Sequence, residues 1–426
     1  MKKLSVSIEI SGSQVEVGSI TGSNYEDACF RYSSAYLSKA DNAPISISLP
    51  RQEETFSCDK TRNFFEGLLP EGFTRRSVAQ VMHVDEKDYI SILSGLGREC
   101  LGAIKITEEN SEDSFEYERL SNEQVKELAR DGASKSVSLI TKAHLSLTGA
   151  SGKVGLYYDE NSKEWYLPIG SAPSTHIVKQ SHIRLKGIVT NEQLSLQTAS
   201  KLGIDIPDTF IINTGSNTDE DILLATRRYD REFGDEANKT NGMRIPYRLH
   251  QEDFAQALGI ASSDKYEKSD ENYLTAMFEL LKMKSSSPVE DSLKLWDIIA
   301  FDFLIGNTDN HIKNLSLLYS RDLRRIRLAP AYDIVSTTIY EGSSRDMAMA
   351  IGGNVSIDAI SRASFQKAAE MAGINKKTAM SRLDNMCSRF DAALSMSAEE
   401  LMDNGFDKAN EIADAIRKTG GMAKMK

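Results

Sequence analysis

The feature that most constrains the fold of this chain is a long apolar run that stops at a glycine and a polar cluster. Ser287 followed by Pro288 marks a helix start, with Glu290 placed to complete a capping box. Residues 293–305 are then mostly apolar, which predicts a helix that buries most of its surface. Because this helix is expected to end at Gly306, the polar residues that follow must emerge from a rigid part of the core.

The polar cluster has the spacing of a phosphoryl-transfer site. Four residues separate Asp309 from Asn314, and Asp333 follows two short apolar stretches, 315–319 and 326–328, that predict a pair of strands. In such a set the first Asp can accept the proton of a hydroxyl nucleophile, while the Asn and the second Asp hold Mg²⁺ against ATP phosphates. Their oxygen atoms suit Mg²⁺ better than zinc. The alternative is an ordinary polar loop, where Asp and Asn are common.

Two upstream segments are candidates for phosphate contacts. Residues 146–153 are rich in small residues that let backbone amides approach phosphates, although Val154 stands where a Walker A loop requires Ser or Thr. A predicted strand, 175–179, ends in Lys179, which is either a phosphate ligand or a solvated strand-end lysine. A helix expected to be capped by Thr190 places Glu192 in its first turn, where Glu192 either pairs with Lys179 or simply suits the helix dipole.

Seven segments together resemble the HipA-type toxins, the serine/threonine kinase half of bacterial toxin–antitoxin pairs. They occur in the family's order across nearly the whole chain, so their joint occurrence is far more specific than any one of them. The segments are 65–72 (FEGLLPEG), 96–103 (LGRECLGA), 146–153, 175–179, 228–231 (RYDR), 309–314 and 332–333.

The resemblance implies a catalytic set, a metal site and a nucleotide site. Asp309 would be the catalytic base, assisted by Lys179 and Asn314, and Asn314 and Asp333 would bind Mg²⁺. Ser146 matches the serine that family members autophosphorylate, which expels the loop and switches the kinase off. The implied nucleotide-binding residues are Thr148, Gly149, Ala150, Ser151, Gly152, Lys153, Lys179, Arg227, Arg228, Tyr229, His311, Lys313, Asn314, Tyr332 and Asp333.

The same resemblance implies ATP and Mg²⁺ as cofactors, a cellular protein as substrate, and a HipB-like helix-turn-helix antitoxin through which the protein reaches DNA. The chain departs from better-known members at Ser151-Gly152, where they carry Gln-Glu, and at Arg227, where the classical toxin has Glu. Neither departure touches Asp309, Asn314 or Asp333, so catalytic competence is expected. Two alternatives stay open: a small-molecule kinase on the same scaffold, and a non-catalytic corepressor.

Composition and charge argue against several other kinds of protein. The chain has 426 residues and a formal net charge of −11, which makes it a poor nucleic-acid binder by itself. Its four cysteines lack metal-site spacing, and it shows neither a leader nor a long uncharged apolar run. We therefore expect a cytoplasmic protein with reduced thiols and no membrane association.

The chain is expected to adopt an α+β, two-lobed, protein-kinase-like fold with a mixed N-terminal lobe and a mostly helical C-terminal lobe. The predicted parts are a HipA-like N-terminal subdomain (1–108), a kinase N-lobe core with the phosphate-binding loop (109–231) and a helical C-lobe with the catalytic and metal-binding loops (232–426). A helical insert is expected near 62–76, and the C-terminal residues 418–426 are expected to fray. The helices expected in the C-lobe are 252–258, 271–282, 289–305, 365–372, 376–390 and 398–417.

Overall fold

The structure is a computed structural model of the chain and describes residues 2–109, 111, 114–144, 146, 152–181, 185–234, 239–240, 242–268 and 271–425. The backbone divides into two compact units. Unit 1 comprises Met1–Gln180, Ala225–Ser263 and Leu318–Arg325, and unit 2 comprises Ser181–Leu224, Asp264–Leu317 and Ile326–Lys426. This division does not test the three-part division expected from the sequence, which stays a prediction.

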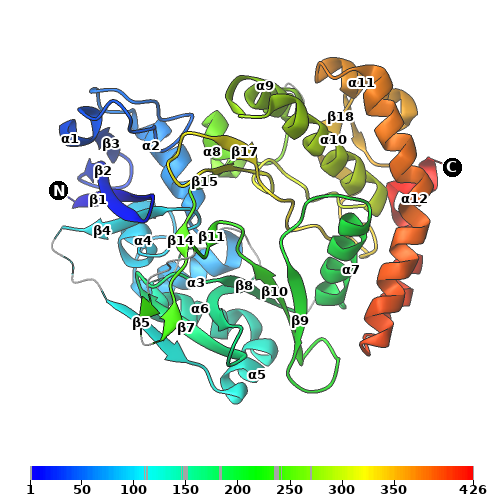
Figure 1. Ribbon diagram of the computed structural model, residues 1–426, viewed down its shortest axis with the longest axis horizontal. Coiled ribbons are helices and arrows are strands. Elements are labelled where there is room, and N and C mark those ends of the chain that lie inside the picture. Colours follow the sequence, from blue (N-terminus) through cyan, green and yellow to red (C-terminus); the bar gives the residue numbers. More distant parts are fainter. Residues whose placement is uncertain are drawn as a thin grey trace. The chain divides into compact units, whose positions relative to one another are not determined.

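Unit 1 contains most of the strands (Figure 1). Its first sheet has the order β3-β2-β1-β4, and its second has the order β5-β7-β6-β8, followed by residues 225–227 of β10 (Ile222–Arg227). The strands are β1 (Lys2–Ile10), β2 (Ser13–Gly22), β3 (Cys29–Tyr32), β4 (Ile104–Glu108), β5 (Phe115–Arg119), β6 (Lys153–Asp159), β7 (Glu164–Gly170), β8 (His176–Gln180), β11 (Arg231–Glu232), β12 (Lys239–Thr240), β13 (Met243–Arg244), β14 (Tyr247–Arg248) and β15 (Gln251–Asp253).

The helices of unit 1 cover these sheets. Helix α4 packs against β4, α2 against β3, and α6 against β6 and β7. Alternating buried residues of β1, namely Leu4, Val6 and Ile8, form part of the core, as expected for a strand with one face covered. The helices are α1 (Ser34–Leu37), α2 (Cys58–Phe65), the 3₁₀ turn η1 (Glu66–Leu68), α3 (Gly72–Met82), α4 (Tyr89–Leu96), α5 (Asn122–Arg130), α6 (Gly132–Ala143) and α8 (Phe254–Leu258).

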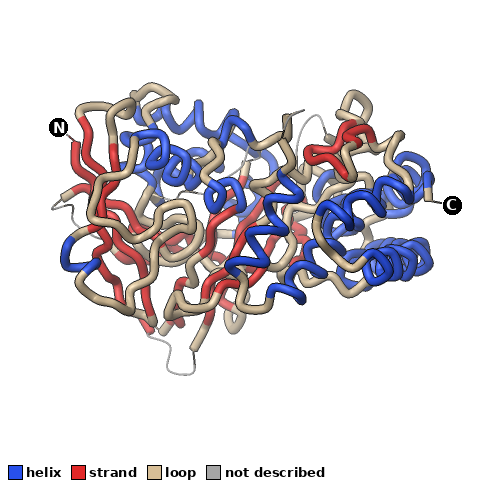
Figure 2. The backbone as a smooth tube through the Cα atoms, turned by 90° about the horizontal axis from the view of Figure 1, so that it is seen from above, coloured by secondary structure: helices blue, strands red, loops and turns tan. Residues whose placement is uncertain are grey.

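Unit 2 is mostly helical, and Figure 2 shows helices gathered near the C-terminus. Helix α10 packs against α9 and α12, and α12 packs in turn against α7, α11 and α13. The elements are α7 (Ile188–Lys201), β9 (Thr209–Asn213), α9 (Tyr273–Lys284), α10 (Pro288–Ile305), β17 (Ile326–Leu328), β18 (Asp346–Ile351), β19 (Asn354–Ser356), α11 (Arg362–Met371), α12 (Lys376–Asp403), α13 (Lys408–Thr419) and η3 (Gly421–Lys424). Strands β10 (Ile222–Arg227) and β16 (Ser316–Tyr319) and the turn η2 (Ser262–Asp264) cross the division between the units.

Helix α10 is the buried core helix that the sequence predicts. Trp296 lies edge-on to Phe365 with ring centroids 5.8 Å apart, and its indole nitrogen donates to the Ala379 carbonyl oxygen over 3.0 Å. Phe303 contacts the same Phe365 ring at 5.3 Å. Gly306 ends the helix in the left-handed region, with φ of 79°. The predicted end of the helix is thereby confirmed.

Several helix boundaries differ from the expectation. Helix α7 begins after Gly187, which is left-handed, so Thr190 lies inside the helix and does not cap it, and Glu192 lies beyond the first turn. Ser287 is the N-cap of α10, but its side chain makes no capping hydrogen bond, so the capping box was wrong. The expected insert near 62–76 is two helices, α2 and α3, joined by η1.

The C-terminal region also differs. Helix α12 continues unbroken through 391–397 and ends at Asp403, beside Gly405 with φ of 87°. The expected fraying of the C-terminal residues was wrong for residues 418–425. Helix α13 runs to Thr419, and η3 follows it with Gly421 and Met422 buried.

Candidate active site

The polar loop after α10 is anchored to a buried carboxyl group of that helix. Asp302 accepts hydrogen bonds from the side-chain amides of Asn307 at 2.8 Å and Asn310 at 2.5 Å. The Asn307 backbone N–H donates to the Asp302 carbonyl oxygen over 2.8 Å. Burial raises the pKa of Asp302 to about 8, against the opposing effect of the two amide donors. One core residue therefore sets the orientation of the loop at two points.

This anchoring presents Asp309 at the surface while its neighbours are buried. Asp309 is exposed, whereas Asn310 and His311 are buried. The Asn314 side-chain amide donates to the Asp309 carbonyl oxygen over 3.1 Å, so the loop closes on itself. The Tyr266 hydroxyl donates to Asp309 Oδ1 over 2.8 Å. A carboxylate held in this way can accept a proton from a bound hydroxyl group.

A second segment joins the loop through a tyrosine. The Tyr332 hydroxyl donates to the Lys313 carbonyl oxygen over 3.1 Å and lies 2.7 Å from the Ser316 hydroxyl. Asp333 follows directly and adopts a left-handed φ of 59°, an uncommon conformation that often marks a functional position. The predicted strands β16 and β17 are confirmed, and Ala329 N–H donates to the Ser316 carbonyl oxygen over 2.9 Å. Unit 2 thus brings the segment of Asp333 back to the loop of Asp309 and Asn314.

The donor atoms of this loop fit a hard divalent cation. Asn314 and Asp333 are partly exposed and offer an amide and a carboxylate oxygen, the ligand types that Mg²⁺ accepts alongside water and phosphate. Within the described ranges no three residues of the His, Cys, Asp and Glu types cluster as a metal site. A site with few protein ligands, completed by nucleotide phosphates, is the pattern of phosphoryl-transfer enzymes.

His311 and Lys313 lie in the same loop and are both buried. The His311 ring meets the Tyr266 ring edge-on, with centroids 5.4 Å apart. Tyr266 therefore touches two residues of the loop, although no sequence pattern pointed to it. Its own segment lies some forty residues upstream, so only the tertiary fold reveals the contact.

In unit 1, two of the predicted nucleotide-binding lysines lie side by side. Lys153 of β6 and Lys179 of β8 are directly paired in an antiparallel register, so their side chains share one face of the sheet. Both are half-buried. Two lysines on one face can both approach the same phosphate groups, which agrees with their predicted role as phosphate ligands. Most of the predicted phosphate-binding loop lies outside the described residues, namely Thr148, Gly149, Ala150 and Ser151. Gly152 is described and directly precedes β6.

Ser146 is fully buried in unit 1. Its hydroxyl donates to the Leu68 carbonyl oxygen over 2.6 Å, and its backbone N–H donates to the Glu99 carbonyl oxygen over 2.8 Å. The serine is thereby held against two of the segments that carry the HipA resemblance, 65–72 and 96–103.

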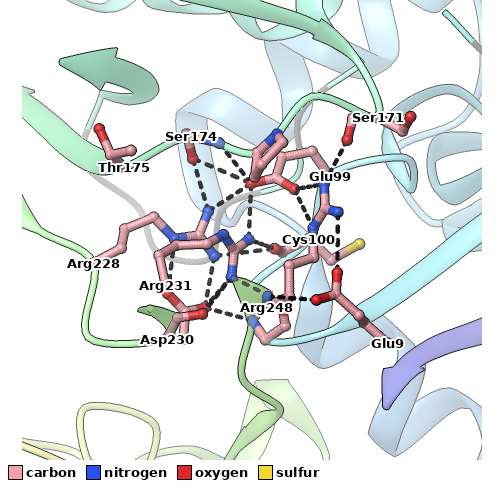
Figure 3. Close-up of polar contacts among 12 residues, drawn as sticks. Glu9, Glu99, Cys100, Ser171, Ser174, Thr175, Arg228, Asp230, Arg231 and Arg248 are labelled. Carbon is pink, nitrogen blue, oxygen red and sulfur yellow. Dashed lines mark hydrogen bonds and ion pairs between the residues drawn. The ribbon is translucent and has the colours of Figure 1, made fainter. Parts of the chain in front are cut away.

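The side chain of Glu99 lies at the centre of a buried ionic cluster (Figure 3). One carboxylate oxygen accepts from Arg228 at 3.1 Å and Arg231 at 2.8 Å, and the other accepts from Arg248 at 2.7 Å. Asp230 holds Arg228 by two bonds, of 2.9 and 2.6 Å. Burial alone would raise the pKa of Glu99, but the three guanidinium groups outweigh it and lower the pKa to about 2.

The cluster determines how the predicted adenine segment is presented. Because the Arg228 side chain is enclosed by the cluster, only its backbone can face a ligand. Arg227 is half-buried and lies 3.6 Å from Glu160, and the Tyr229 hydroxyl bonds to Gln251. The RYDR string (228–231) thus serves largely to build the core of unit 1, which the sequence did not reveal.

The predicted site residues are divided between the two units. Unit 1 contains Lys153, Lys179 and Arg227 to Tyr229, and unit 2 contains Asp309, Asn314, Tyr332 and Asp333. That the two groups form one nucleotide site stays a prediction. Helices long and apolar enough to cross a lipid bilayer are absent from the described part of the chain.

Comparison with known proteins places this chain in a family. The family model of the HipA-like C-terminal domain matches residues 145–394, and that of the HipA N-terminal domain matches residues 8–107. The chain is 32% identical over 420 residues to the putative kinase Y4mE of Sinorhizobium fredii, which covers 96% of each protein. It is 26% identical over 365 residues to the serine/threonine-protein kinase toxin HipA of Shewanella oneidensis, covering 82% of this chain and 80% of that protein.

A solved structure matches as well. HipA from the complex of HipA, HipB and operator DNA of Shewanella oneidensis MR-1 superimposes with a TM-score of 0.78 at 20% sequence identity, covering 97% of both chains. The fold and the loop therefore define a kinase-like protein, and the expected α+β, kinase-like fold is confirmed. The chain belongs to the HipA family.

Proposed function

We propose that this protein is an ATP-dependent serine/threonine protein kinase that acts as the toxin of a type II toxin–antitoxin system. The observation that carries the proposal is the exposed Asp309, whose carboxylate accepts from Tyr266 and whose backbone is tied by Asn314 at the end of a buried helix. The named activity of the relative from Shewanella oneidensis supports the serine/threonine specificity.

In this proposal each residue has one task. Asp309 orients the serine or threonine hydroxyl of a cellular protein and accepts its proton as the oxygen attacks the γ-phosphorus. Lys179 and Lys153 hold the ATP phosphates, and the backbone of Arg227 to Tyr229 lies along the adenine. Mg²⁺, held by Asn314 and Asp333, would offset the negative charge of the phosphates. His311, Lys313 and Tyr332 support the loop that contacts the nucleotide.

Ser146 is the proposed regulatory phosphosite. Its hydroxyl has no room for a phosphate group while it donates to Leu68 inside the core, so a phosphorylated Ser146 must leave this position. A doubly charged phosphate cannot be buried there without cationic partners, which favours displacement of the loop. The displaced loop would no longer cover the phosphates of ATP, and the kinase would be inactive.

The proposed partner is a helix-turn-helix antitoxin that carries the protein to DNA. The structural relative is described in complex with HipB and operator DNA. The net charge of −11 agrees with contact to DNA through such a partner, since direct phosphate contacts need an excess of Lys and Arg.

The test compares the wild-type protein with Asp309→Gln. Purified protein is incubated with Mg²⁺, labelled ATP and an extract of proteins from a bacterial cell, and label is located by peptide mass spectrometry. We expect label on serine or threonine of an extract protein and on Ser146, with a rate at least about 100-fold lower for Asp309→Gln. ATP affinity, measured by calorimetry, should be similar for both.

Three results would contradict parts of the proposal. More than about a tenth of the activity in Asp309→Gln would exclude the residue as base, because such groups typically contribute 10²–10⁴-fold. Label confined to small molecules would favour the small-molecule kinase, and absence of any ATP turnover would favour the corepressor. Label on Ser151 instead of Ser146 would reject the Ser146 switch alone.

A further inference from the structure

Two of the four cysteines meet in the N-terminal part of unit 1. Cys29 is the first residue of β3 and Cys58 is the first residue of α2, and their sulfur atoms lie 2.7 Å apart. Both side chains are partly exposed, and all four cysteines of the chain are free thiols. Sulfur atoms at this separation need to move by less than about 1 Å to reach the covalent distance of about 2.05 Å.

The packing on either side of the two cysteines holds them together. The Phe30 N–H donates to the Thr61 hydroxyl over 2.9 Å, which joins β3 to α2. The Phe56 N–H donates to the Phe30 carbonyl oxygen over 2.9 Å, which holds the chain that enters α2. The rings of Phe30 and Phe65 pack with centroids 5.3 Å apart. The approach of the sulfur atoms is therefore fixed by the core and does not depend on the thiols themselves.

We propose that Cys29 and Cys58 form a reversible redox site, at which a small-molecule disulfide such as oxidised glutathione converts the two thiols into an intramolecular disulfide. The inference goes beyond the proposed kinase activity and does not depend on it. The sequence predicts that these thiols are reduced in a cytoplasm, and the proposal adds an oxidised form that they can reach reversibly.

The reaction runs through two exchanges of sulfur partners. Cys58 loses its proton and its thiolate attacks one sulfur of the small disulfide, which releases a small thiolate and leaves a mixed disulfide on Cys58. The Cys29 sulfur then attacks the Cys58 sulfur, which expels the second small thiolate. The two cysteine protons end on the two released thiols, so the protein loses two protons and two electrons, and the small disulfide gains them.

The surroundings assign Cys58 as the first nucleophile. It begins an eight-residue helix between the exposed residues Ser57 and Asp59, whereas Cys29 lies between the buried residues Ala28 and Phe30, so a small disulfide reaches Cys58 more easily. Cys29 keeps its proton, because burial and the hydrogen bond to Cys58 raise the pKa of its thiol to about 12. Cys29 is thus the resolving cysteine, which reacts once Cys58 carries the mixed disulfide.

The cross-link would close the segment from Cys29 to Cys58, which includes α1 and the stretch that contacts α8. Ser48 donates to the Gln256 carbonyl oxygen over 2.7 Å, and Ser46 donates to the Glu252 carboxylate over 2.5 Å. Oxidation should therefore restrain a segment that already packs on the core of unit 1, and should raise its resistance to unfolding.

The experiment treats the full, folded chain with oxidised glutathione and then blocks remaining thiols with an alkylating reagent before peptide mass spectrometry. For wild type we expect one intramolecular link between the peptides of Cys29 and Cys58, the loss of two hydrogen atoms from the intact mass, and full recovery with dithiothreitol. The oxidised protein should melt several degrees higher than the reduced protein. The matched control Cys387→Ser, which changes a half-buried cysteine on α12, should form the same link.

The single variants separate this reaction from general thiol oxidation. Cys29→Ser should stop at a glutathione adduct on Cys58, whereas Cys58→Ser should react at least tenfold more slowly at Cys29. A wild-type protein that carries stable glutathione adducts on both cysteines, or forms intermolecular links on a non-reducing gel, would overturn the proposal. So would a protein that keeps four free thiols under conditions in which its urea-unfolded form is oxidised.

Discussion

At the scale of single residues, Asp302 is the one that most directly controls the candidate catalytic loop. It is buried in α10, and its two carboxylate oxygens accept from Asn307 and Asn310. Asparagine has the same shape but only one acceptor oxygen, and its amide would face a second amide donor. The loop that carries Asp309 must then shift at one of its two anchor points.

We predict that Asp302→Asn lowers kcat by roughly 5- to 100-fold, which corresponds to about 1–3 kcal/mol for one unsatisfied buried group. The measurement is the steady-state rate of phosphoryl transfer, with thermal unfolding to confirm the fold. Asp297→Asn is the control, because Asp297 lies on the same helix but pairs with Arg382 on α12. Equal rates for wild type and Asp302→Asn would exclude the anchoring role.

The pH dependence of stability gives a second readout. Since the folded pKa of Asp302 is raised to about 8, from an ordinary value of 3.8, the folded protein keeps this proton where the unfolded chain has lost it. The group's contribution to the free energy of unfolding is therefore greatest below pH 4 and declines as pH rises to about 8. Asp302→Asn should remove this part of the decline.

At the residue scale, the sequence pointed to the polar residues of the loop and of the segment that joins it, and missed the residues that hold them. Asp309, Asn314 and Asp333 follow the spacing expected of a phosphoryl-transfer site. Asp302 appeared only as an interruption of an apolar run, and Tyr266 comes from a segment without a pattern. Supporting residues are selected by tertiary contacts, which a linear spacing does not record.

At the scale of secondary-structure elements, Gly306 connects α10 to the loop. Its φ of 79° costs a side-chain-bearing residue about 1–2 kcal/mol. A Cβ atom at Gly306 would also lie 2.2 Å from the Thr338 hydroxyl oxygen and 3.1 Å from the Gly420 Cα atom. Helix α10 can therefore end at this point only with glycine.

We expect Gly306→Ala to destabilise the protein more than Gly342→Ala does, as measured by urea unfolding. Gly342 has a similar φ of 85°, but no described atom lies within 4 Å of its added Cβ. The control thus isolates the backbone strain, and the difference between the variants reports the steric overlap. Equal free energies of unfolding would show that Thr338 and Gly420 yield without cost.

The other helix ends explain why some boundaries were predicted and others were not. Gly306 directly follows an apolar run, so the stop signal coincides with a change of pattern. The end of α12 at Gly405 follows a long amphipathic stretch without such a change, and the prediction divided the helix at 391–397 instead. The start of α7 depends on a left-handed Gly187 without a capping side chain, which leaves no capping signature in the sequence.

The ionic cluster joins several elements of unit 1, so its effect is on the stability of that unit. Removing one partner of a buried ion pair leaves an uncompensated charge and typically costs about 3–5 kcal/mol. We predict a loss of this size for Glu99→Gln at pH 7, because Arg228, Arg231 and Arg248 would then face a neutral amide. Glu116→Gln, which changes an exposed glutamate on β5, should have little effect.

The same variant has a defined acid signature. The folded pKa of Glu99 is lowered to about 2 from an ordinary 4.5, so its stabilising contribution is complete above pH 4.5 and is lost as pH falls toward 2. The difference in unfolding free energy between wild type and Glu99→Gln should therefore shrink over that range. A difference that stays constant down to pH 2.5 would show that the carboxylate charge is not what stabilises the cluster.

At the scale of the whole molecule, the family and the fold were predictable from the sequence. Motifs spread over the chain in a fixed order specify a fold, because each must occupy its own place in it. The HipA family and the kinase-like fold are confirmed on that basis. The expected boundaries at 108 and 231 came from local composition and stay predictions; local composition does not record that each compact unit is built from segments far apart in the sequence.

The net charge of the whole chain bears on whether the protein binds DNA by itself. With 51 Lys and Arg against 62 Asp and Glu, the chain carries a net negative charge, which opposes its approach to the phosphate backbone of DNA. We predict that the protein alone does not shift duplex DNA in an electrophoretic assay at about 0.15 M salt, even near 10⁻⁴ M, the weak limit of ordinary non-specific binding. Addition of a helix-turn-helix antitoxin should produce a DNA complex that contains both proteins. Binding of the isolated chain at micromolar concentration, with a steep loss of affinity on adding salt, would instead reveal a local basic surface of its own and contradict the proposed indirect route to DNA.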